Sequence, residues 1–367
     1  MSEAYKKIYF VTGGGTGGHI YPALAIINKI KEKEPNSEFL YIGTTDRMEA
    51  TIIPELGYNY VGLEIKGLNR RKPLKNFSVL KSFLKAVKKA KTEIKNFKPD
   101  VVLGVGGYVT LPVIYAAHSL KIKTFIHEQN SIPGLSNKLL NKKVDAIGVS
   151  LPSSLNHFDK KKTTYTGNPR SEEVINVDKV DKKKYDLTKN KKLVLFVMGS
   201  LGSQTVNNMM QEILPKFEKK DYEVLFVTGK DYYDNYKKMK NIPKNVKLVP
   251  YLNDMLGVMK STDLIVSRAG ASTISEITAL GLPSILIPSP YVTHNHQEEN
   301  AKVLENNGAS IIIKEKDLND EILLEKIDLI LNDTKRYNEM VRCNKKLGIT
   351  DSATRIYKII KELIDNN

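Results

Sequence analysis

Each half of the chain opens with the same local pattern, an apolar run followed by a glycine-rich loop and a helical periodicity. The first copy covers residues 7–21 and holds five glycines within residues 12–19, and the second covers residues 192–206 with its loop at 199–203. A strand, a glycine loop and a helix in succession aim bare backbone N–H groups and a helix N-terminus at a polar ligand. The repetition favours two Rossmann-like domains.

Short apolar runs alternate with helical patterns along the chain, which is the order of βαβ units and parallel sheets. At 367 residues the chain is long for a single core. We therefore predict an α/β fold of two Rossmann-like, doubly wound parallel-sheet domains facing a cleft. The predicted domains are residues 1–166, residues 167–345, and a C-terminal helix within 346–367 that packs back on the first domain. The predicted strands are 8–11, 39–42, 101–105, 124–126 and 146–149, then 193–198, 224–228, 246–249, 264–267 and 284–287.

The net charge of +16 is concentrated in the first half. Residues 1–166 carry 26 Lys or Arg against 13 Asp or Glu, whereas the remaining residues carry 31 against 28. Charge of one sign on one half points to a polyanionic partner, either nucleic acid or an anionic membrane surface. No helix-turn-helix, RNP or zinc signature accompanies the basic residues, so we expect no nucleic-acid partner.

Residues 77–97 read as an amphipathic helix whose apolar and basic side chains interleave. One interpretation is an ordinary Rossmann helix with a solvated lysine face. The other is peripheral docking on anionic lipid, at roughly 1 kcal/mol per basic residue near the surface. The one-sided charge of the first domain favours docking, and the residues expected to face the membrane are Phe77, Leu80, Lys81, Phe83, Leu84, Lys85 and Lys88.

The first glycine loop departs from two common nucleotide sites. Gly13, Gly15 and Gly18 match the spacing of the dinucleotide fingerprint, but the first acid after the second strand, Asp46, comes too late to bind a ribose. No Gly-Lys-Ser/Thr follows the loop, which excludes a Walker loop. His19 directly after the glycines adds a group that titrates near neutral pH. We expect this loop to be part of an active site.

Six motifs in order over residues 12–301 resemble the MurG family of glycosyltransferases. They are the loop 12–19, Gly104-Val105-Gly106-Gly107-Tyr108, His127-Glu128-Gln129-Asn130 with 133–138, the segment 166–170, the segment 267–276 with 281–283, and the segment 296–301. One departure lies in the second glycine loop, where Leu201 replaces the amide-bearing residue that many members carry.

The resemblance implies the GT-B architecture and an inverting transfer of N-acetylglucosamine (GlcNAc) from UDP-GlcNAc by direct displacement. The implied acceptor is the muramyl-pentapeptide pyrophosphoryl-undecaprenol intermediate, lipid I, and the product is lipid II of peptidoglycan biosynthesis. The implied location is peripheral, on the cytoplasmic face of the bacterial cell membrane, with other cell-wall synthesis or division proteins as further partners. Two alternatives stay open: a GT-B transferase with another lipid acceptor, and a catalytically silent nucleotide-sugar-binding protein.

The resemblance also assigns the residues that bind UDP-GlcNAc. Glu276 would accept the ribose hydroxyls, the backbone of Leu252 would bind the uracil edge, and Gln297 and Asn300 would hold the sugar. The other implied donor-site residues are Thr16, Gly17, Gly18, Asn130, Ala271, Ser272 and Thr273.

The leaving UDP gains negative charge, and no Asp-x-Asp motif is present in the chain to place a metal ion on it. We therefore expect no required cofactor and no dedicated metal site, although assistance by a divalent cation stays open. Ser200, the helix after the second glycine loop and Arg170 are the groups expected to meet this charge.

The attacking hydroxyl must lose a proton, and His19 is the candidate general base because an ordinary histidine pKa of about 6.5 suits neutral pH. Glu128 is the rival base, and His127 is a candidate orienting residue. With His127, the residues Gly106, Gly107 and Tyr108 complete the expected acceptor side.

Overall fold

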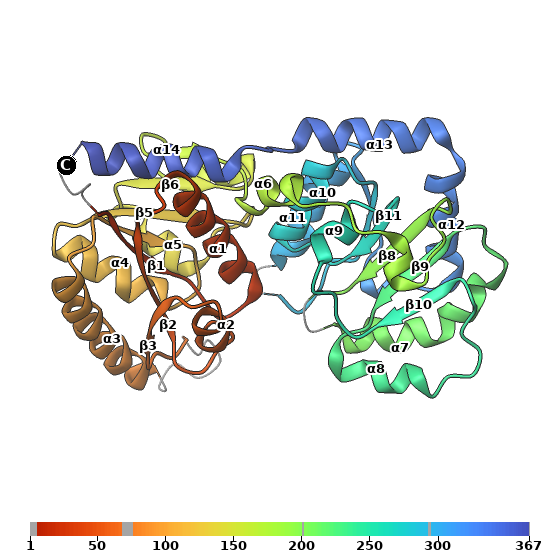
Figure 1. Ribbon diagram of the computed structural model, residues 1–367, viewed down its shortest axis with the longest axis horizontal. Helices are drawn as coiled ribbons and strands as arrows, with labels where there is room; N and C mark the ends of the chain where they lie inside the picture. The colour runs from red at the N-terminus through yellow and green to blue at the C-terminus, as the bar shows by residue number, and fades with distance from the viewer. Residues whose placement is uncertain (1–5, 68–75, 200–201, 293–294, 367) are drawn as a thin grey trace. The chain divides into compact units, whose positions relative to one another are not determined.

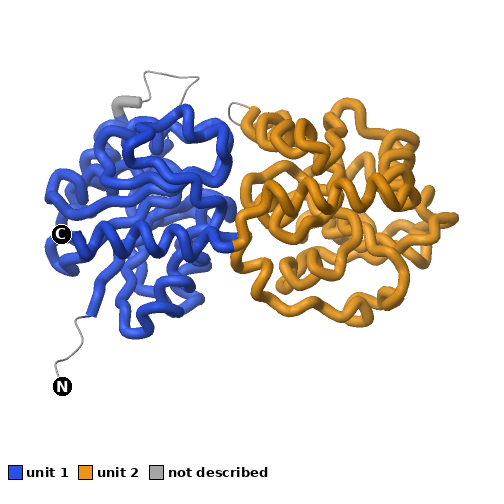
Figure 2. The backbone as a smooth tube through the Cα atoms, turned by 90° about the horizontal axis from the view of Figure 1, so that it is seen from above, with its two compact units in different colours: residues 1–170, 351–367 blue, residues 171–350 orange. Residues whose placement is uncertain are grey.

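The computed structural model describes residues 6–67, 76–199, 202–292 and 295–366. The chain divides into two compact units, one of residues 1–170 and 351–367 and one of residues 171–350, coloured blue and orange in Figure 2. Each unit is an α/β layer structure built around one parallel sheet, so the predicted fold class is confirmed.

The sheet of the first unit has seven strands in the order β3-β2-β1-β4-β5-β6-β7. All pairings are parallel, and Phe10 on β1 lies between Leu40 on β2 and Val102 on β4. Near-continuous apolar runs suit strands that are covered on both faces. The strands are β1 (Ile8–Thr12), β2 (Glu38–Thr44), β3 (Asn59–Leu63), β4 (Val101–Gly104), β5 (Lys123–Glu128), β6 (Ala146–Val149) and β7 (Thr163–Tyr165).

Helices cover both faces of this sheet (Figure 1). Buried side chains of α3 and α4 form a core with one face, and those of α1 and α14 form a core with the other. The helices are α1 (Gly17–Lys33), α2 (Glu49–Glu55), α3 (Asn76–Phe97), α4 (Thr110–Ser119), α5 (Leu135–Leu140) and α14 (Ser352–Asp365), with a 3₁₀ helix η2 (Pro152–His157).

The second unit contains a six-stranded parallel sheet in the order β10-β9-β8-β11-β12-β13. Its strands are β8 (Leu193–Val197), β9 (Glu223–Val227), β10 (Val246–Val249), β11 (Leu264–Ser267), β12 (Ser284–Leu286) and β13 (Ser310–Ile312). The α-helices begin with α6 (Arg170–Asn176), whose first residue still belongs to the first unit. They continue with α7 (Gln204–Ile213), α8 (Lys230–Lys237), α9 (Met255–Met259), α10 (Ala271–Leu280), α11 (His296–Glu305), α12 (Asp320–Asn332) and α13 (Thr334–Leu347). Among the described residues of this unit, 3₁₀ helices are formed by η3 (Lys182–Tyr185), η4 (Leu214–Lys219) and η6 (Glu315–Asp317).

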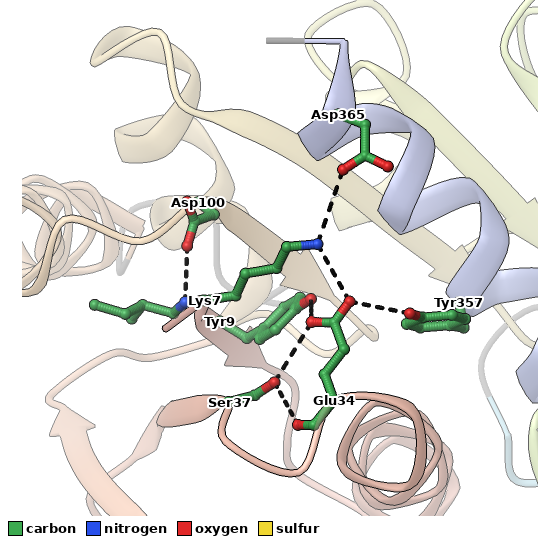
Figure 3. A network of polar contacts seen from close by, with 8 residues as sticks. Lys7, Tyr9, Glu34, Ser37, Asp100, Tyr357 and Asp365 are labelled. Atoms are coloured by element: carbon green, nitrogen blue, oxygen red, sulfur yellow. Dashed lines mark hydrogen bonds and ion pairs between the residues drawn. The ribbon is translucent and has the colours of Figure 1, made fainter. Parts of the chain in front are cut away.

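The C-terminal helix α14 returns to the first unit, where Ile356 and Ile360 are buried beside α1. A polar cluster anchors the same helix, as Figure 3 shows. The carboxylate of Glu34, directly after α1, accepts hydrogen bonds from Tyr9 Oη at 2.7 Å, Tyr357 Oη at 3.0 Å and Lys7 Nζ at 3.2 Å. The cluster therefore joins the first strand, the end of α1 and the last helix of the chain.

Replacing Glu34 by glutamine is expected to destabilise the first unit by roughly 1.5–3 kcal/mol at pH 7, the usual worth of hydrogen bonds to a charged group. Burial by itself raises the pKa of Glu34, but the bonds from Tyr9, Tyr357 and Lys7 outweigh it and hold that pKa below its usual value of 4.5. A lowered folded-state pKa gives stability that is present above the unfolded pKa and lost as pH falls through the folded one. The difference between the variant and the wild type should therefore shrink below pH 4.5.

Urea unfolding at pH 7 and pH 3, with amide hydrogen exchange in α14, measures this effect. Glu362→Gln, an exposed position on α14, is the matched control and should change little at either pH. A destabilisation by Glu34→Gln that is equal at both pH values would contradict the charge-based account.

Candidate functional site

Two glycine loops interlock at the carboxyl edge of the first sheet. Gly14 N donates to Gly106 O at 3.2 Å, joining the loop after β1 to the loop after β4. Gly107 has a φ of +86°, and a Cβ there would lie 2.5 Å from Gly14 O. Only glycine combines this left-handed backbone with so close an approach. These glycines therefore let two backbone loops pack against each other.

His19 lies in the first turn of α1, half-buried against the second loop. A Cβ built on Gly106 would be 2.6 Å from His19 Cδ2, so the imidazole lies directly over that glycine. The Nδ1 atom of His19 is 2.8 Å from Gly14 O. A carbonyl oxygen only accepts, so the proton of the neutral ring is on Nδ1 and Nε2 is its basic nitrogen. Of the predicted neighbours, Thr16 and Gly18 are exposed and Gly17 is half-buried.

His127 is fully buried and ties three loops together. Its Nε2 donates to Gly167 O at 3.0 Å, which leaves Nδ1 to accept from Gln129 Nε2 at 3.2 Å. Gln129 Nε2 also donates to Val105 O at 3.0 Å. Burial lowers the pKa of His127 to about 4, so this imidazole is neutral at pH 7. The geometry is that of a residue that orients the loops around it.

Glu128, at the end of β5, is buried among hydrogen-bond donors. Its carboxylate accepts from Asn130 N at 3.0 Å, Asn130 Nδ2 at 3.3 Å, Gly134 N at 3.0 Å and Asn137 Nδ2 at 2.9 Å. These four bonds fold the loop between β5 and α5. Asn130 and Tyr108 are both half-buried in the loops at this edge.

Arg170 closes the segment after β7, where its backbone N donates to Asn168 Oδ1 at 3.1 Å. Its guanidinium carbon lies 5.4 Å from the ring centroid of Tyr21, which is within cation–π range on α1. The structure thus brings Arg170 to the helix that also carries His19.

Glu49 is a residue that the sequence reasoning missed. It is fully buried at the start of α2, and its carboxylate accepts from Gly15 N at 2.9 Å, Thr44 N at 3.1 Å and Thr44 Oγ1 at 2.8 Å. Tyr41 Oη adds a bond to Gly13 O at 2.9 Å. The first glycine loop is therefore held from within the protein by a carboxylate and a phenol. The sequence feature that could have indicated Glu49 is an acidic residue shortly after the second strand.

In the second unit, the loop after β8 leads into α7 through Gly202, whose φ is +75°. Ser200 and Leu201 lie outside the described residues. The guanidinium of Arg268, after β11, donates from Nη1 to Ile287 O at 3.0 Å and from Nη2 to Ser203 Oγ at 2.6 Å. Arg268 also forms a buried ion pair with Glu315. Arg268 belongs to the motif at residues 267–276, but no role was predicted for it from the sequence. Through Ser203, it anchors the N-terminus of α7.

The other predicted donor-site residues come after strands β10, β11 and β12 of the second sheet. Leu252 is buried just after β10, and the buried Asn300 donates from Nδ2 to Ala269 O at 3.3 Å. Gln297 Oε1 accepts from Ser289 N at 2.9 Å. Glu276 is buried in the second turn of α10. The first turn of the same helix is formed by Ala271, Ser272 and Thr273.

On α3, Leu80 and Leu84 are exposed at 55% and 59%. The lysines at 81, 85 and 88 are also exposed. Phe83 packs inward against Tyr115 of α4, with ring centroids 6.2 Å apart. The side chain of Phe77 lies outside the described residues.

Two negative findings concern the described part of the chain. None of its helices is both long enough and apolar enough to pass through a bilayer. Nor do its His, Cys, Asp and Glu side chains gather in any group of three or more that could hold a metal ion.

Comparisons with known proteins cover almost the whole chain. Residues 9–149 match the glycosyltransferase family 28 N-terminal domain, and residues 193–356 match the glycosyltransferase family 28 C-terminal domain. A Bacillus cytotoxicus protein is 46% identical over 358 residues, covering 96% of this chain and 98% of its own. A Bacillus pumilus protein is 44% identical over 357 residues, with the same coverages. Both are named UDP-N-acetylglucosamine–N-acetylmuramyl-(pentapeptide) pyrophosphoryl-undecaprenol N-acetylglucosamine transferase.

Solved structures agree on the fold. The crystal structure of Acinetobacter baumannii MurG has a TM-score of 0.78 at 24% identity, covering 97% of this chain and 99% of its own. A UDP-GlcNAc 2-epimerase from Neisseria meningitidis, solved with UDP-GlcNAc bound, has a TM-score of 0.67 at 15% identity and covers 97% of this chain and 100% of its own. At such identities the likeness concerns architecture alone.

Proposed function

Because this chain belongs to the MurG family, within glycosyltransferase family 28, we propose that it transfers GlcNAc from UDP-GlcNAc to lipid I and forms lipid II. The observation in the molecule that carries the proposal is the fixed tautomer of His19, whose Nδ1 is held on Gly14 O. It makes Nε2 a positioned base at the edge of the sheet where α/β enzymes bind their substrates.

In the proposed reaction, the acceptor hydroxyl gives its proton to His19 Nε2 while its oxygen bonds to the anomeric carbon. The bond from that carbon to the diphosphate oxygen breaks, and UDP leaves with the electron pair. A single displacement of this kind inverts the anomeric centre. Glu128 is the less suitable base because its carboxylate already accepts four hydrogen bonds within its own loop. We assign it the role of organising that loop.

The second unit would bind UDP-GlcNAc. Glu276 would accept the two ribose hydroxyls, the backbone of Leu252 would bind the uracil edge, and Gln297 and Asn300 would hold the sugar hydroxyls. Ala271, Ser272 and Thr273 form the first turn of α10, just before Glu276, and would lie next to the bound nucleotide.

The charge that develops on the leaving UDP would be met without a dedicated metal site. The N-terminus of α7 would supply backbone N–H groups and a positive dipole end, and Ser200 precedes this helix in the sequence. The family resemblance also assigns Arg170 and residues 16–18 to binding of the nucleotide sugar. Together these groups would offer the diphosphate the charge of Arg170, a helix dipole and polar hydrogen-bond donors.

The deciding experiment is the transfer of labelled GlcNAc from UDP-GlcNAc to a short-chain lipid I analogue, with and without EDTA. A disaccharide-lipid product, unaffected by EDTA, is the expected result. Diacylglycerol in a parallel reaction tests the alternative lipid acceptor. Binding of UDP-GlcNAc without transfer to either acceptor would overturn the enzymatic proposal and favour a silent binding protein.

We also propose that the first unit docks on anionic lipid at the cytoplasmic membrane surface through exposed side chains of α3, α4 and α5. Other cell-wall synthesis or division proteins would be its neighbours there. Besides Leu80 and Leu84 on α3, the side chains of Leu135 and Leu139 on α5 are exposed at 43% and 53%. Tyr115 of α4 lies beneath Lys143, whose Nζ is 5.4 Å from its ring centroid. Exposed leucines among lysines are the pattern of a peripheral lipid-binding surface.

Neutralising Lys81, Lys85 and Lys88 to glutamine is expected to weaken binding to phosphatidylglycerol vesicles on the order of 100-fold, at about 1 kcal/mol per lysine. Vesicle sedimentation at low and physiological salt measures it. The matched control replaces three exposed lysines of the second unit, at 219, 238 and 240. Equal losses in the two triple variants would mean that total charge, rather than this face, governs binding.

A further inference from the structure

We propose that Glu49 is a positioning residue for the base His19 and acts on it through the peptide bond between Gly14 and Gly15. The inference rests on the proposed function only in naming His19 as the base. Its geometric part concerns one carboxylate, one peptide group and one imidazole, all within the first unit.

The two side chains bind opposite ends of the same peptide group. Glu49 Oε2 accepts from Gly15 N at 2.9 Å, and Gly14 O lies 2.8 Å from His19 Nδ1. The N–H and the C=O in these two bonds belong to one planar amide, which is polarised from both sides. A Cβ on Gly14 would lie 2.1 Å from Glu49 Oε1, so the carboxylate is pressed directly against the loop.

The carboxylate is itself held in place, which a positioning role requires. Thr44 donates to Glu49 Oε1 from both its backbone N, at 3.1 Å, and its Oγ1, at 2.8 Å. Glu49 is fully buried, where electrostatic effects are screened least. An exposed acid in a flexible loop could not act on the imidazole in this way.

The chemical effect follows from the polarisation of hydrogen-bonded chains. A carboxylate that accepts from the N–H pushes electron density of the amide toward the carbonyl oxygen. This oxygen then becomes a stronger acceptor for the Nδ1 proton. When Nε2 takes the acceptor's proton, the ring becomes an imidazolium whose Nδ1–H is stabilised by that oxygen. Glu49 thus does through one amide what the orienting carboxylate of a catalytic triad does by direct contact.

The other ionisable groups near the hydrogen bonds between Glu49 and His19 are not positioned to replace Glu49. Burial raises the pKa values of Tyr41 and Tyr60, so both stay neutral and donate to backbone carbonyls. The hydrogen bond that Arg47 donates to Tyr108 raises the pKa of this exposed guanidinium, which stays positive. His127, which is linked to the loop after β4 through Gln129, is neutral. Glu128 is bonded within its own loop, and Arg170 lies over Tyr21.

The test is the titration of His19 in the full-length protein, followed by NMR of labelled histidine. Glu49→Gln keeps the shape but removes the charge, and is expected to lower the His19 titration midpoint by about one pH unit. In the transfer assay, kcat should fall roughly 10-fold, the acid limb of its pH profile should move to lower pH, and the KM for UDP-GlcNAc should stay within about twofold. Glu55→Gln, an exposed position at the end of the same helix, is the charge-matched control.

A His19 titration that is the same in Glu49→Gln as in the wild type would overturn the proposal and leave Glu49 a purely structural residue. A shifted titration in a protein that transfers no GlcNAc would support the coupling and count against the proposed function instead, so the two failures are distinguishable. If Glu49→Gln does not fold, the wild type alone gives an answer. The Gly15 amide resonance should titrate with His19, and its constancy over that pH range would overturn the proposal.

Discussion

Replacing His19 by asparagine is expected to lower kcat roughly 10²–10⁴-fold, the usual contribution of a general base, while the KM for UDP-GlcNAc changes less than about threefold. The asparagine amide can still donate to Gly14 O from a position close to that of Nδ1, so the loop keeps its bond. What the variant lacks is the basic Nε2. Steady-state rates with the lipid I analogue, at saturating and limiting UDP-GlcNAc, measure the two parameters separately.

Three further variants make this result interpretable. His19→Ala removes both the base and the bond to Gly14, and a loss equal to that of His19→Asn would assign the effect to the base. His118→Asn, an exposed position on α4, should have the activity of the wild type. Glu128→Gln tests the rival: retained activity in both His19 variants, with a loss in Glu128→Gln, would transfer the role of base to Glu128. Activity retained at both positions would place the acceptor site elsewhere.

The sheets could be predicted from the sequence because their central strands are buried on both faces. Runs such as Phe39–Ile42 and Val101–Leu103 are continuous and apolar, which is typical of parallel sheets. The strands that the prediction lacked lie at sheet edges. β3 is only partly buried until Leu63, and β13 has three residues, so neither produces a distinct periodicity. Edge strands carry the weakest signal because one side has no neighbour to select their residues.

The candidate site was predicted only where glycines and a family motif marked it. Glu49 could not be found this way, because an acid at the start of a helix is ordinarily a surface residue that interacts with the dipole. Its burial depends on Gly14 and Gly43 leaving room for its carboxyl and methylene groups, which is a tertiary property. The same holds for Glu128: a carboxylate reads as a candidate base until its four donors are seen. Sequence gives residue types, whereas the role depends on which partners the fold supplies.

Replacing Glu315 by alanine is expected to lower the free energy of unfolding of the second unit by about 3–5 kcal/mol, the cost of leaving one member of a buried ion pair unpaired. The side chains of Arg268 and Glu315 are exposed by only 9% and 5%. Without Glu315, the guanidinium keeps its bonds to Ile287 O and Ser203 Oγ, and neither group neutralises its charge. Urea unfolding followed by hydrogen exchange in β8 and β11 reports on this unit separately.

A double variant separates the stability of this pair from its role in positioning α7. Arg268→Met with Glu315→Leu replaces both charges by apolar groups of similar length, a change that is often neutral for stability. It also removes the donor to Ser203 Oγ, so we expect recovered stability with a raised KM for UDP-GlcNAc. Glu299→Ala, which breaks an exposed pair with Lys302, should cost less than about 1 kcal/mol and serves as the control. A similarly small cost for Glu315→Ala would show that water reaches Arg268, and a normal KM in the double variant would show that α7 needs no anchor from β11.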